Sequence, residues 1–424
     1  MNAPDPSRGS RDAAAGPAQG SRAPRSLPEI LRLVALDTTS RNSNLELIGL
    51  VRDQLAEQGV TAHVLPNGDG RKANLVATIP AHDGTTAGGI VLSGHTDVVP
   101  VDGQEWSSEP FEAEVRDERL YGRGTCDMKS FLGVVLHTVP TLLAAKLSEP
   151  VHLAFSYDEE VGCGGGAALV EALPGLGLSP RICIVGEPSS MRVVAAHKSI
   201  NLVNLHFRGV AAHSSLTPQG VNAIEYAARA IASIRDMADE FRQSGPFDDA
   251  YVVPSTTASV NVIEGGIASN TVAERCDVQL EFRSISASDP AQIVDRICQR
   301  CAELEQQMRA ENPAASVEVE VVAQVPGLDT DGASPAIPFA VELGGTRSSD
   351  KVTYGTEAGL FQAAGIETVV CGPGDIAQAH APNEFIELSQ IERCEEFLAS
   401  LVRRLDTGDD TAAGSTTEHD GESR

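Results

Sequence analysis

The sequence lacks any long apolar run. No window of the 424 residues approaches the about 18 uninterrupted apolar residues that a transmembrane helix needs. Residues 1–26 are rich in Ala, Gly, Ser, Pro and Arg, without the apolar central segment of a secretory signal. We therefore expect no membrane span, a disordered tail over residues 1–26 and a cytoplasmic protein.

Basic residues are scarce. The chain has 32 Lys and Arg against 59 Asp and Glu, for a formal net charge of −27. Nucleic acid is excluded as a partner, because its phosphates need a basic face. The acidic surface could favour cationic substrates, although a solvated acidic surface explains it as simply. Residues 406–424 are polar and acidic, so we expect a second disordered tail there.

Paired cysteine motifs are also lacking. Of the eight cysteines, only Cys298 and Cys301 form a CxxC, in a helical stretch with no second pair. We interpret them as thiols on a helix face, and we expect no disulfides in a cytoplasmic enzyme. The glycine cluster at 162–166 lacks the spacing of a dinucleotide-binding loop and is predicted to be a flexible turn into a helix.

The apolar spacing predicts helices and buried strands in alternation at both ends of the chain. Helices are expected over 27–36, 45–58, 130–147, 337–343 and 355–364, and strands over 73–79, 89–93, 151–156, 181–185 and 368–371. This pattern is typical of an α/β fold with a mixed, largely parallel sheet and flanking helices. We assign it to residues 27–189 and 326–405, as one metal-binding catalytic domain.

The pattern between these two segments is different. A long strand over 193–207 is followed by a helix (222–236), two paired strands (257–264 and 273–283), a helix (291–310) and a strand (316–322). Strand, helix, strand, strand, helix, strand is the order of a ferredoxin-like α+β unit. We therefore predict an inserted domain over residues 190–325.

Acidic and histidine residues gather where the predicted strands end. His380 follows a strand through a longer loop, and five such residues follow buried strands directly: His95, Asp97, Glu159, Glu160 and Glu187. Ligands of open α/β sheets bind at this edge, and crowded carboxylates need a compensating cation. Two histidines and three carboxylates can hold two zinc ions if one carboxylate bridges, although cobalt or manganese also suits them. Each residue alone has a structural explanation, but six at one edge favour a metal site.

The motifs around these residues resemble the M20 family of metallopeptidases and deacylases. They are Gly94–Pro100 (GHTDVVP), Gly122–Lys129 (GRGTCDMK), Asp158–Glu160, Gly186–Pro188 and Gln378–Glu384 (QAHAPNE). The resemblance spans Leu27 to Leu405. It implies that the inserted domain serves as a lid and a dimerisation domain.

The resemblance also implies a role for each residue. Asp127 bridges two metal ions, which are completed by His95 and Glu187 on one side and by Glu160 and His380 on the other. Asp97 hydrogen-bonds the His95 imidazole, Glu159 is the general base, and the Asp127–Met128 peptide bond is cis.

Four further residues are expected to bind substrate, and one to stabilise the oxyanion. Arg283, with Asn270 beside it, would grip the substrate carboxylate, and Gly355 and Thr356 would open a helix whose free N–H groups bind an anion. The resemblance implies that His213 donates to the oxyanion in the site of a partner subunit, and hence that the protein is a homodimer. A strand arginine, a helix cap and a structural loop histidine are the alternative explanations.

Within the family, three segments resemble acetylornithine deacetylases: Gly186–Ser189 with His197-Lys198, Gly220–Glu225 and Tyr354–Ala358, although Ser199 stands where a glycine is expected. This implies deacetylation of N2-acetyl-L-ornithine in arginine biosynthesis, with two zinc ions per subunit and cobalt as a substitute. The metal residues leave open a succinyl-diaminopimelate desuccinylase, an aminoacylase or a dipeptidase. A non-catalytic, metal-stabilised binding protein is the remaining alternative, and the retention of Glu159 argues against it.

Overall fold

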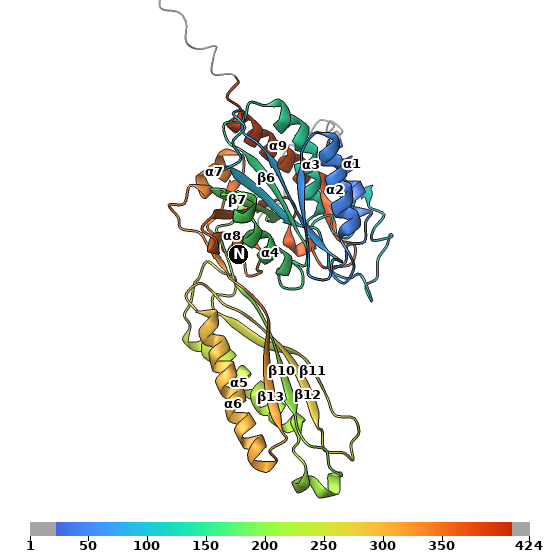
Figure 1. Ribbon diagram of the computed structural model, residues 1–424, viewed down its shortest axis with the longest axis vertical. Helices are drawn as coiled ribbons and strands as arrows, with labels where there is room; N and C mark the ends of the chain where they lie inside the picture. Colours follow the sequence, from blue (N-terminus) through green and yellow to red (C-terminus); the bar gives the residue numbers. More distant parts are fainter. Residues whose placement is uncertain (1–22, 409–424) are drawn as a thin grey trace, which may run out of the picture.

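The computed structural model describes residues 23–408, which form an elongated molecule of two parts (Figure 1). The expected tails, residues 1–26 and 406–424, lie almost entirely outside the described residues. No helix within residues 23–408 is long and apolar enough to cross a membrane.

The first part is built on a six-stranded sheet in the order β1-β2-β6-β3-β7-β16. Its strands are β1 (Ala62–Pro66), β2 (Ala73–Ile79), β6 (Val151–Ser156), β3 (Ile90–His95), β7 (Ile182–Pro188) and β16 (Glu367–Gly372). The four strands from β6 to β16 run parallel, and β1 and β2 are antiparallel at one edge. The expected mixed, largely parallel sheet is confirmed.

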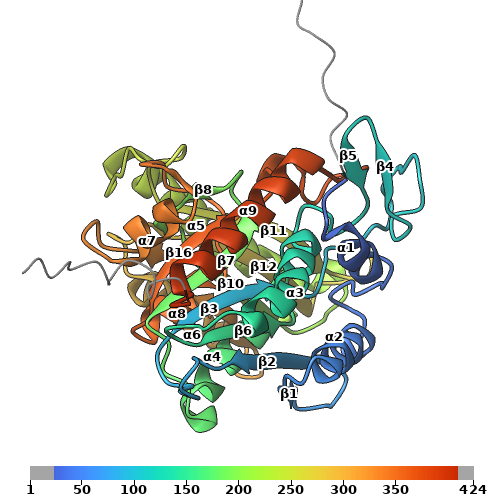
Figure 2. The ribbon, with the colours of Figure 1, turned by 90° about the horizontal axis from the view of Figure 1, so that it is seen from above.

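Helices cover both faces of this sheet (Figure 2). One face packs against α1 (Leu27–Val34), α2 (Leu45–Glu57), α3 (Lys129–Ala144), α7 (Ala336–Glu342) and α9 (Leu388–Leu405), and the other against α4 (Gly164–Ala172) and α8 (Ala358–Ala363). Successive strand side chains point to opposite faces, so Leu92 joins the first core and Val91 the second. Burial on both faces explains why these strands are continuous apolar runs.

A small sheet, which the sequence analysis did not predict, lies beside the main one. It pairs β17 (Phe385–Glu387) with β5 (Arg119–Tyr121), and β5 with β4 (Glu114–Arg116), all antiparallel. Each strand has only three residues, too few for an alternating pattern to be recognised in the sequence.

The second part is a four-stranded antiparallel sheet with two helices packed on one face (Figure 1). In chain order its elements are β10 (Ile200–Arg208), α5 (Ala223–Ser244), β11 (Thr257–Gly265), β12 (Arg275–Arg283), α6 (Pro290–Glu311) and β13 (Ser316–Val325). The spatial order β11-β12-β10-β13 is that of a ferredoxin-like unit, as expected.

Two elements differ from the prediction. The single strand expected over 193–207 is three strands, because β8 (Arg192–Val193) pairs with β15 (Thr346–Arg347) and β9 (Ala196–His197) with β14 (Leu328–Asp329) before β10 begins. The alternation continues while the chain passes from one sheet to another. The helix expected over 355–364 begins only at Ala358, whose N–H is accepted by the Thr356 hydroxyl.

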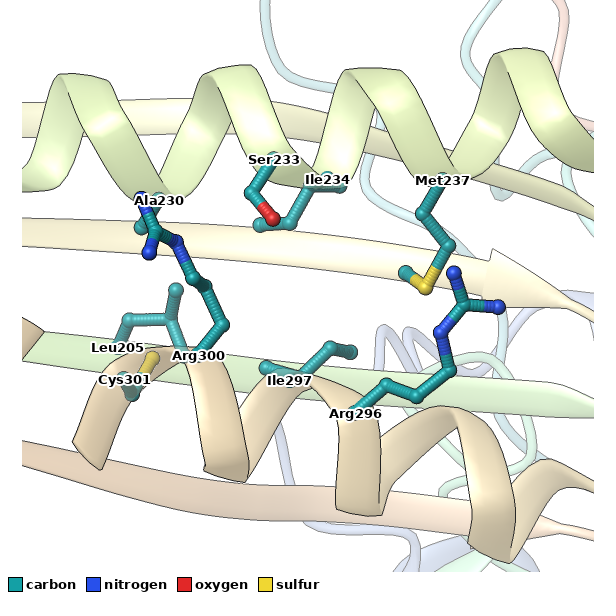
Figure 3. A pocket seen from close by; sticks show the side chains of 9 residues that line it. All are labelled: Leu205, Ala230, Ser233, Ile234, Met237, Arg296, Ile297, Arg300 and Cys301. Carbon is teal, nitrogen blue, oxygen red and sulfur yellow. The ribbon is translucent and has the colours of Figure 1, made fainter. Parts of the chain in front are cut away.

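We call the second part, from β10 to β13, the lid, and its two helices leave a small cavity against β10. It has a volume of about 70 Å³, and Leu205, Ile297 and Cys301 are among its lining residues (Figure 3). Cys301 is buried and Cys298 is partly exposed, and both are free thiols on α6. Neither belongs to a potential metal-binding group among residues 23–408.

Gly186 of β7 lies against the ring of Phe131, and a Cβ at this position would come within 2.1 Å of the ring. Gly186→Ala should therefore destabilise the metal-free protein by about 1–3 kcal/mol, the usual cost of overpacking a core. Gly175→Ala is the control, because no heavy atom lies within 4 Å of its Cβ position. Urea unfolding of both variants tests this, and equal midpoints would contradict the packing described here.

Candidate metal centre

The parallel strands bring the predicted ligands to one edge of the sheet. His95 is the last residue of β3, Glu187 lies near the end of β7, and Glu159 and Glu160 follow β6. Asp127 lies in the loop before α3. The peptide bond between Asp127 and Met128 is cis, as expected. Since β6, β3 and β7 are adjacent, their carboxyl ends converge at the same place.

Asp127 lies between the two histidines. Its Oδ1 is 2.9 Å from Nε2 of His95, and its Oδ2 is 3.3 Å from Nε2 of His380. Nε2 of His380 is also 3.0 Å from Oε2 of Glu160, while Nε2 of His95 is 3.6 Å from Oε1 of Glu187. Each histidine thus has its own carboxylate, and the two oxygens of Asp127 face the two groups separately.

These residues fit divalent cations. Ligand atoms of His95, Asp127 and Glu160 lie within 4.8 Å of one another, and so do those of His95, Glu159 and Glu187. Within the described residues, Oε1 of Glu160 and Oε1 of Glu187 are buried without a hydrogen-bond partner. Buried carboxylate oxygens without donors are costly, and imidazole with carboxylate is a donor set that suits zinc.

The pKa values of these groups reflect their burial and the charges of their neighbours. Burial raises the pKa of Glu187 well above its ordinary value, and the nearby charges of Asp127 and Glu159 raise it further. Burial also raises the pKa of Asp127, but hydrogen bonds from the two histidines outweigh it and keep this pKa below its ordinary value. Hydrogen bonds to Asp127 and Glu160 raise the pKa of His380 to about 10. The raised pKa values show that negative charge in this cluster favours the binding of positive charge, either as protons or as metal cations.

Glu159 faces the same cluster but makes few contacts. Its Oε1 is 3.3 Å from Sγ of Cys163. Burial raises its pKa to about 8, an effect that His95 opposes and that Glu160 and Asp127 reinforce. A carboxyl group with its pKa near neutrality can both accept and donate a proton at physiological pH.

The predicted hydrogen bond between the Asp97 carboxylate and the His95 imidazole is not formed. Nδ1 of His95 is bonded to the main-chain oxygen of Asp97 at 2.9 Å, whereas the Asp97 carboxylate is 3.6 Å away. That carboxylate instead accepts the N–H groups of Glu159 at 3.1 Å and Glu160 at 3.3 Å, and the hydroxyl of Ser40 at 2.7 Å. The expected imidazole contact is replaced because the loop after β6 supplies nearer donors. Ser40, far away in the sequence, was not predicted.

Three of the four residues expected to bind the substrate carboxylate lie at the junction of the two parts. The expectation that Asn270 lies beside Arg283 is wrong, because the nine residues of β12 separate them. Arg283 ends β12 beside the start of β10, and its Nε is 2.5 Å from Oε1 of Glu281. Thr356 is buried, with its hydroxyl 3.1 Å from Nε2 of His197, and a Cβ on Gly355 would come within 2.5 Å of Ile200. The expectation that Gly355 and Thr356 open a helix is wrong, because α8 begins two residues later and is only six residues long.

His213 and Asn270 lie together at the other end of the lid. The N–H of Ser214 donates to the Asn270 main-chain oxygen at 3.0 Å, and His213 pairs with Thr271. The nine residues of β10 lead from the junction to this end and span about 30 Å. His213 is exposed, and its Nδ1 is 2.8 Å from the Ser215 hydroxyl. Within residues 23–408, neither residue belongs to a group of potential metal ligands.

Two curated proteins are similar to this chain over most of its length. It is 34% identical over 376 residues to an acetylornithine deacetylase of Myxococcus xanthus, covering 88% of this chain and 95% of that protein. It is 31% identical over 364 residues to an acetylornithine deacetylase of Shigella sonnei (strain Ss046), covering 86% and 91%.

Solved structures share the fold. A tripeptidase from Staphylococcus aureus superposes with a TM-score of 0.69 at 20% identity, covering 90% of this chain and 98% of that one. An M20 family metallo-carboxypeptidase from Sulfolobus solfataricus gives 0.69 at 18% identity, covering 89% and 98%. The model of Peptidase family M20/M25/M40 matches residues 91–404. The chain therefore belongs to this peptidase family and is an M20 hydrolase.

Proposed function

We propose that the protein hydrolyses the amide bond of an N-acyl amino acid, most specifically that of N2-acetyl-L-ornithine, to give ornithine and acetate. The arrangement of Asp127 carries the proposal, since its two oxygens face two histidine–carboxylate groups. The two relatives named acetylornithine deacetylase support the substrate. Arginine biosynthesis and a cytoplasmic location belong to the same proposal.

The metal centre would hold two divalent ions, zinc with cobalt as a substitute. Asp127 would bridge them, with His95 and Glu187 on one side and Glu160 and His380 on the other. Two such ions polarise the carbonyl of a scissile amide and lower the pKa of a water molecule between them. The buried, unpartnered oxygens of Glu160 and Glu187 support this assignment.

Glu159 would move the proton. It would take one proton from the attacking water as the new C–O bond forms, and give it to the amine nitrogen as the C–N bond breaks. The second proton of the water passes from the new carboxyl group to the amine, so the products are a carboxylate and an ammonium group, and Glu159 returns to its ionised form. Support comes from its position beside His95 and Glu187 and from its pKa of about 8.

The substrate carboxylate would lie near the junction, where Arg283, Gly355 and Thr356 meet the start of β10. Arg283 would leave Glu281 to grip the carboxylate with two N–H groups, a geometry that guanidinium favours.

Removal of metal should abolish activity, and added zinc or cobalt should restore it, because the carboxylates alone cannot polarise the amide. Asp127→Ala should lose both metal and activity. Elemental analysis with activity assays before and after chelation measures this. Full activity in chelator, with no bound transition metal, would refute the metal centre.

Glu159→Gln should retain the bound metal but lose about 10²–10⁴-fold in turnover, the usual contribution of a positioned acid–base group. Glutamine keeps the size of the side chain but cannot carry the proton. Steady-state kinetics on a variant of proven metal content measures the effect. Near-normal turnover would exclude Glu159 as the base.

A substrate panel separates the remaining family activities. We expect the highest kcat/KM for N-acetylornithine, above N-acetylcitrulline, succinyl-diaminopimelate and dipeptides. Metal-loaded protein without activity on any member would favour the non-catalytic alternative, and preference for another member would reassign the substrate while leaving the metal centre intact.

His213 would act in the site of a second subunit, because β10 separates it from the junction of its own chain and it belongs to no group of potential metal ligands within residues 23–408. Asn270, next to it, would accompany it across the dimer. His213→Ala should then cost about 10²–10³-fold in turnover, the typical loss of one oxyanion donor. Mixing Glu159→Gln with His213→Ala protomers should restore activity, since one site of each mixed dimer has both residues intact. Proven heterodimers without recovery would show that His213 does not act in trans.

A further inference from the structure

Arg123 and Glu384 form a buried ion pair behind the metal centre. Nη1 of Arg123 is 2.6 Å from Oε2 of Glu384, and both side chains are only 1% exposed. Removing two charges from water is costly, and a well-packed apolar pair of similar size is often at least as stable. The pair therefore calls for an explanation other than general stability. Both residues belong to family motifs, yet the sequence analysis assigned a role to neither.

The second oxygen of Glu384 holds the backbone of the bridging residue. Oε1 accepts the N–H of Cys126 at 2.8 Å and the N–H of Asp127 at 3.1 Å. The main-chain oxygen of Glu384 also accepts the N–H of Gly122 at 3.0 Å. Asp127 is thus tied to a residue 257 positions later, on the segment that carries His380.

Arg123 contacts the same segment at Ala381 directly and at His380 through Gln104. Its Nη1 reaches the main-chain oxygen of Ala381 at 3.5 Å, and its Nη2 is 2.6 Å from Oε1 of Gln104. Nε2 of Gln104 then donates to the main-chain oxygen of His380 at 2.9 Å. The guanidinium also lies over the Trp106 ring, 5.1 Å from its centre. Arg123, Gln104 and Glu384 therefore contact the chain at His380, at Ala381 and at Asp127.

His380 needs such support more than the other ligands do. It lies in a loop, its φ is +61°, and its side chain is 53% exposed. A non-glycine residue is uncommon in this left-handed region and is held there by its surroundings. His95 and Glu187, by contrast, are parts of the buried strands β3 and β7 and are fixed by the sheet.

We propose that Arg123 and Glu384 are positioning residues for the metal centre, which hold Asp127 and His380 at the separation needed to bind the ion shared by Glu160 and His380. This inference rests on the metal centre of the proposed function. The site of Glu160 and His380 should depend more on the Arg123–Glu384 ion pair than the site of His95 and Glu187. The reason is that His95 and Glu187 are held in place by the sheet.

The test compares Glu384→Gln and Arg123→Lys with a matched pair of controls. Glutamine keeps the size of the side chain without the charge, and lysine keeps the charge without the two-pronged geometry. The controls are Glu387→Gln and Arg119→Lys. Arg119 and Glu387 form an exposed pair 3.3 Å apart that joins β5 to β17, the strands next to Arg123 and Glu384. Zinc affinities are measured by calorimetry on metal-free protein, with folding checked by circular dichroism.

Wild type and both controls should bind two ions with unchanged affinities. Each test variant should bind the ion of Glu160 and His380 about 10–100-fold more weakly, the usual effect of losing a residue that orients a ligand. The other ion should lose less affinity, because only Asp127 among its ligands is held by the pair. In a His380→Ala background, Glu384→Gln should weaken the second ion little further, because both changes act on the same site. If one test variant does not fold, the other still decides the matter.

Unchanged zinc affinities in folded variants, even with lower urea midpoints, would show that the pair is only structural and would overturn this inference alone. Equal weakening of both ions would also overturn it. If wild-type protein bound no zinc, the proposed function itself would fail, and this inference with it.

Discussion

Buried negative charge at the carboxyl ends of parallel strands is the constraint on which the rest of this structure depends. Asp127, Glu159, Glu160 and Glu187 converge there, and among residues 23–408 the histidines that contact them are His95 and His380. Each strand that delivers a ligand is itself buried on both faces, so the sheet cannot move to relieve the repulsion. The raised pKa values of Glu159 and Glu187 reflect their burial and this repulsion, and divalent cations would offset the negative charge.

The same constraint explains why so many polar groups near the centre serve to hold loops. Asp97 accepts two N–H groups from the loop of Glu159 and Glu160, and Glu384 accepts two from the loop of Asp127. Carboxylates that repel one another stay in place only if their backbones are fixed by other bonds. The lid is connected to the first part through short strands at the junction. His213 and Asn270, at its other end, would be available to a second subunit in the proposed dimer.

Much of this arrangement could be predicted from local patterns. Continuous apolar runs located β2, β3, β6 and β7, and the residues at or after the ends of three of them identified His95, Glu159, Glu160 and Glu187. Asp127 follows none of these strands, and only the resemblance of its motif to the family indicated its role. The ferredoxin-like order was also predictable, because its strands alternate and its helices are long and amphipathic. Apolar periodicity could not show that the chain leaves one sheet at Val193 and joins another at Ile200, since the alternation is the same in both.

Polar contacts between distant segments were the main omission. The Ser40–Asp97 bond joins residues 57 positions apart, and the Arg123–Glu384 bond joins residues 261 positions apart. Neither follows from a local pattern, although both lie in or near motifs that resemble the family. Such contacts depend on how loops from different strands meet, which only the folded chain reveals.

The bridging position of Asp127 is the centre of this account, and anomalous X-ray scattering from zinc-loaded crystals tests it most directly. We expect two zinc peaks, one on each side of the Asp127 carboxylate, with His95 and Glu187 at one and Glu160 and His380 at the other. A single peak, or zinc bound away from Asp127, would contradict the account.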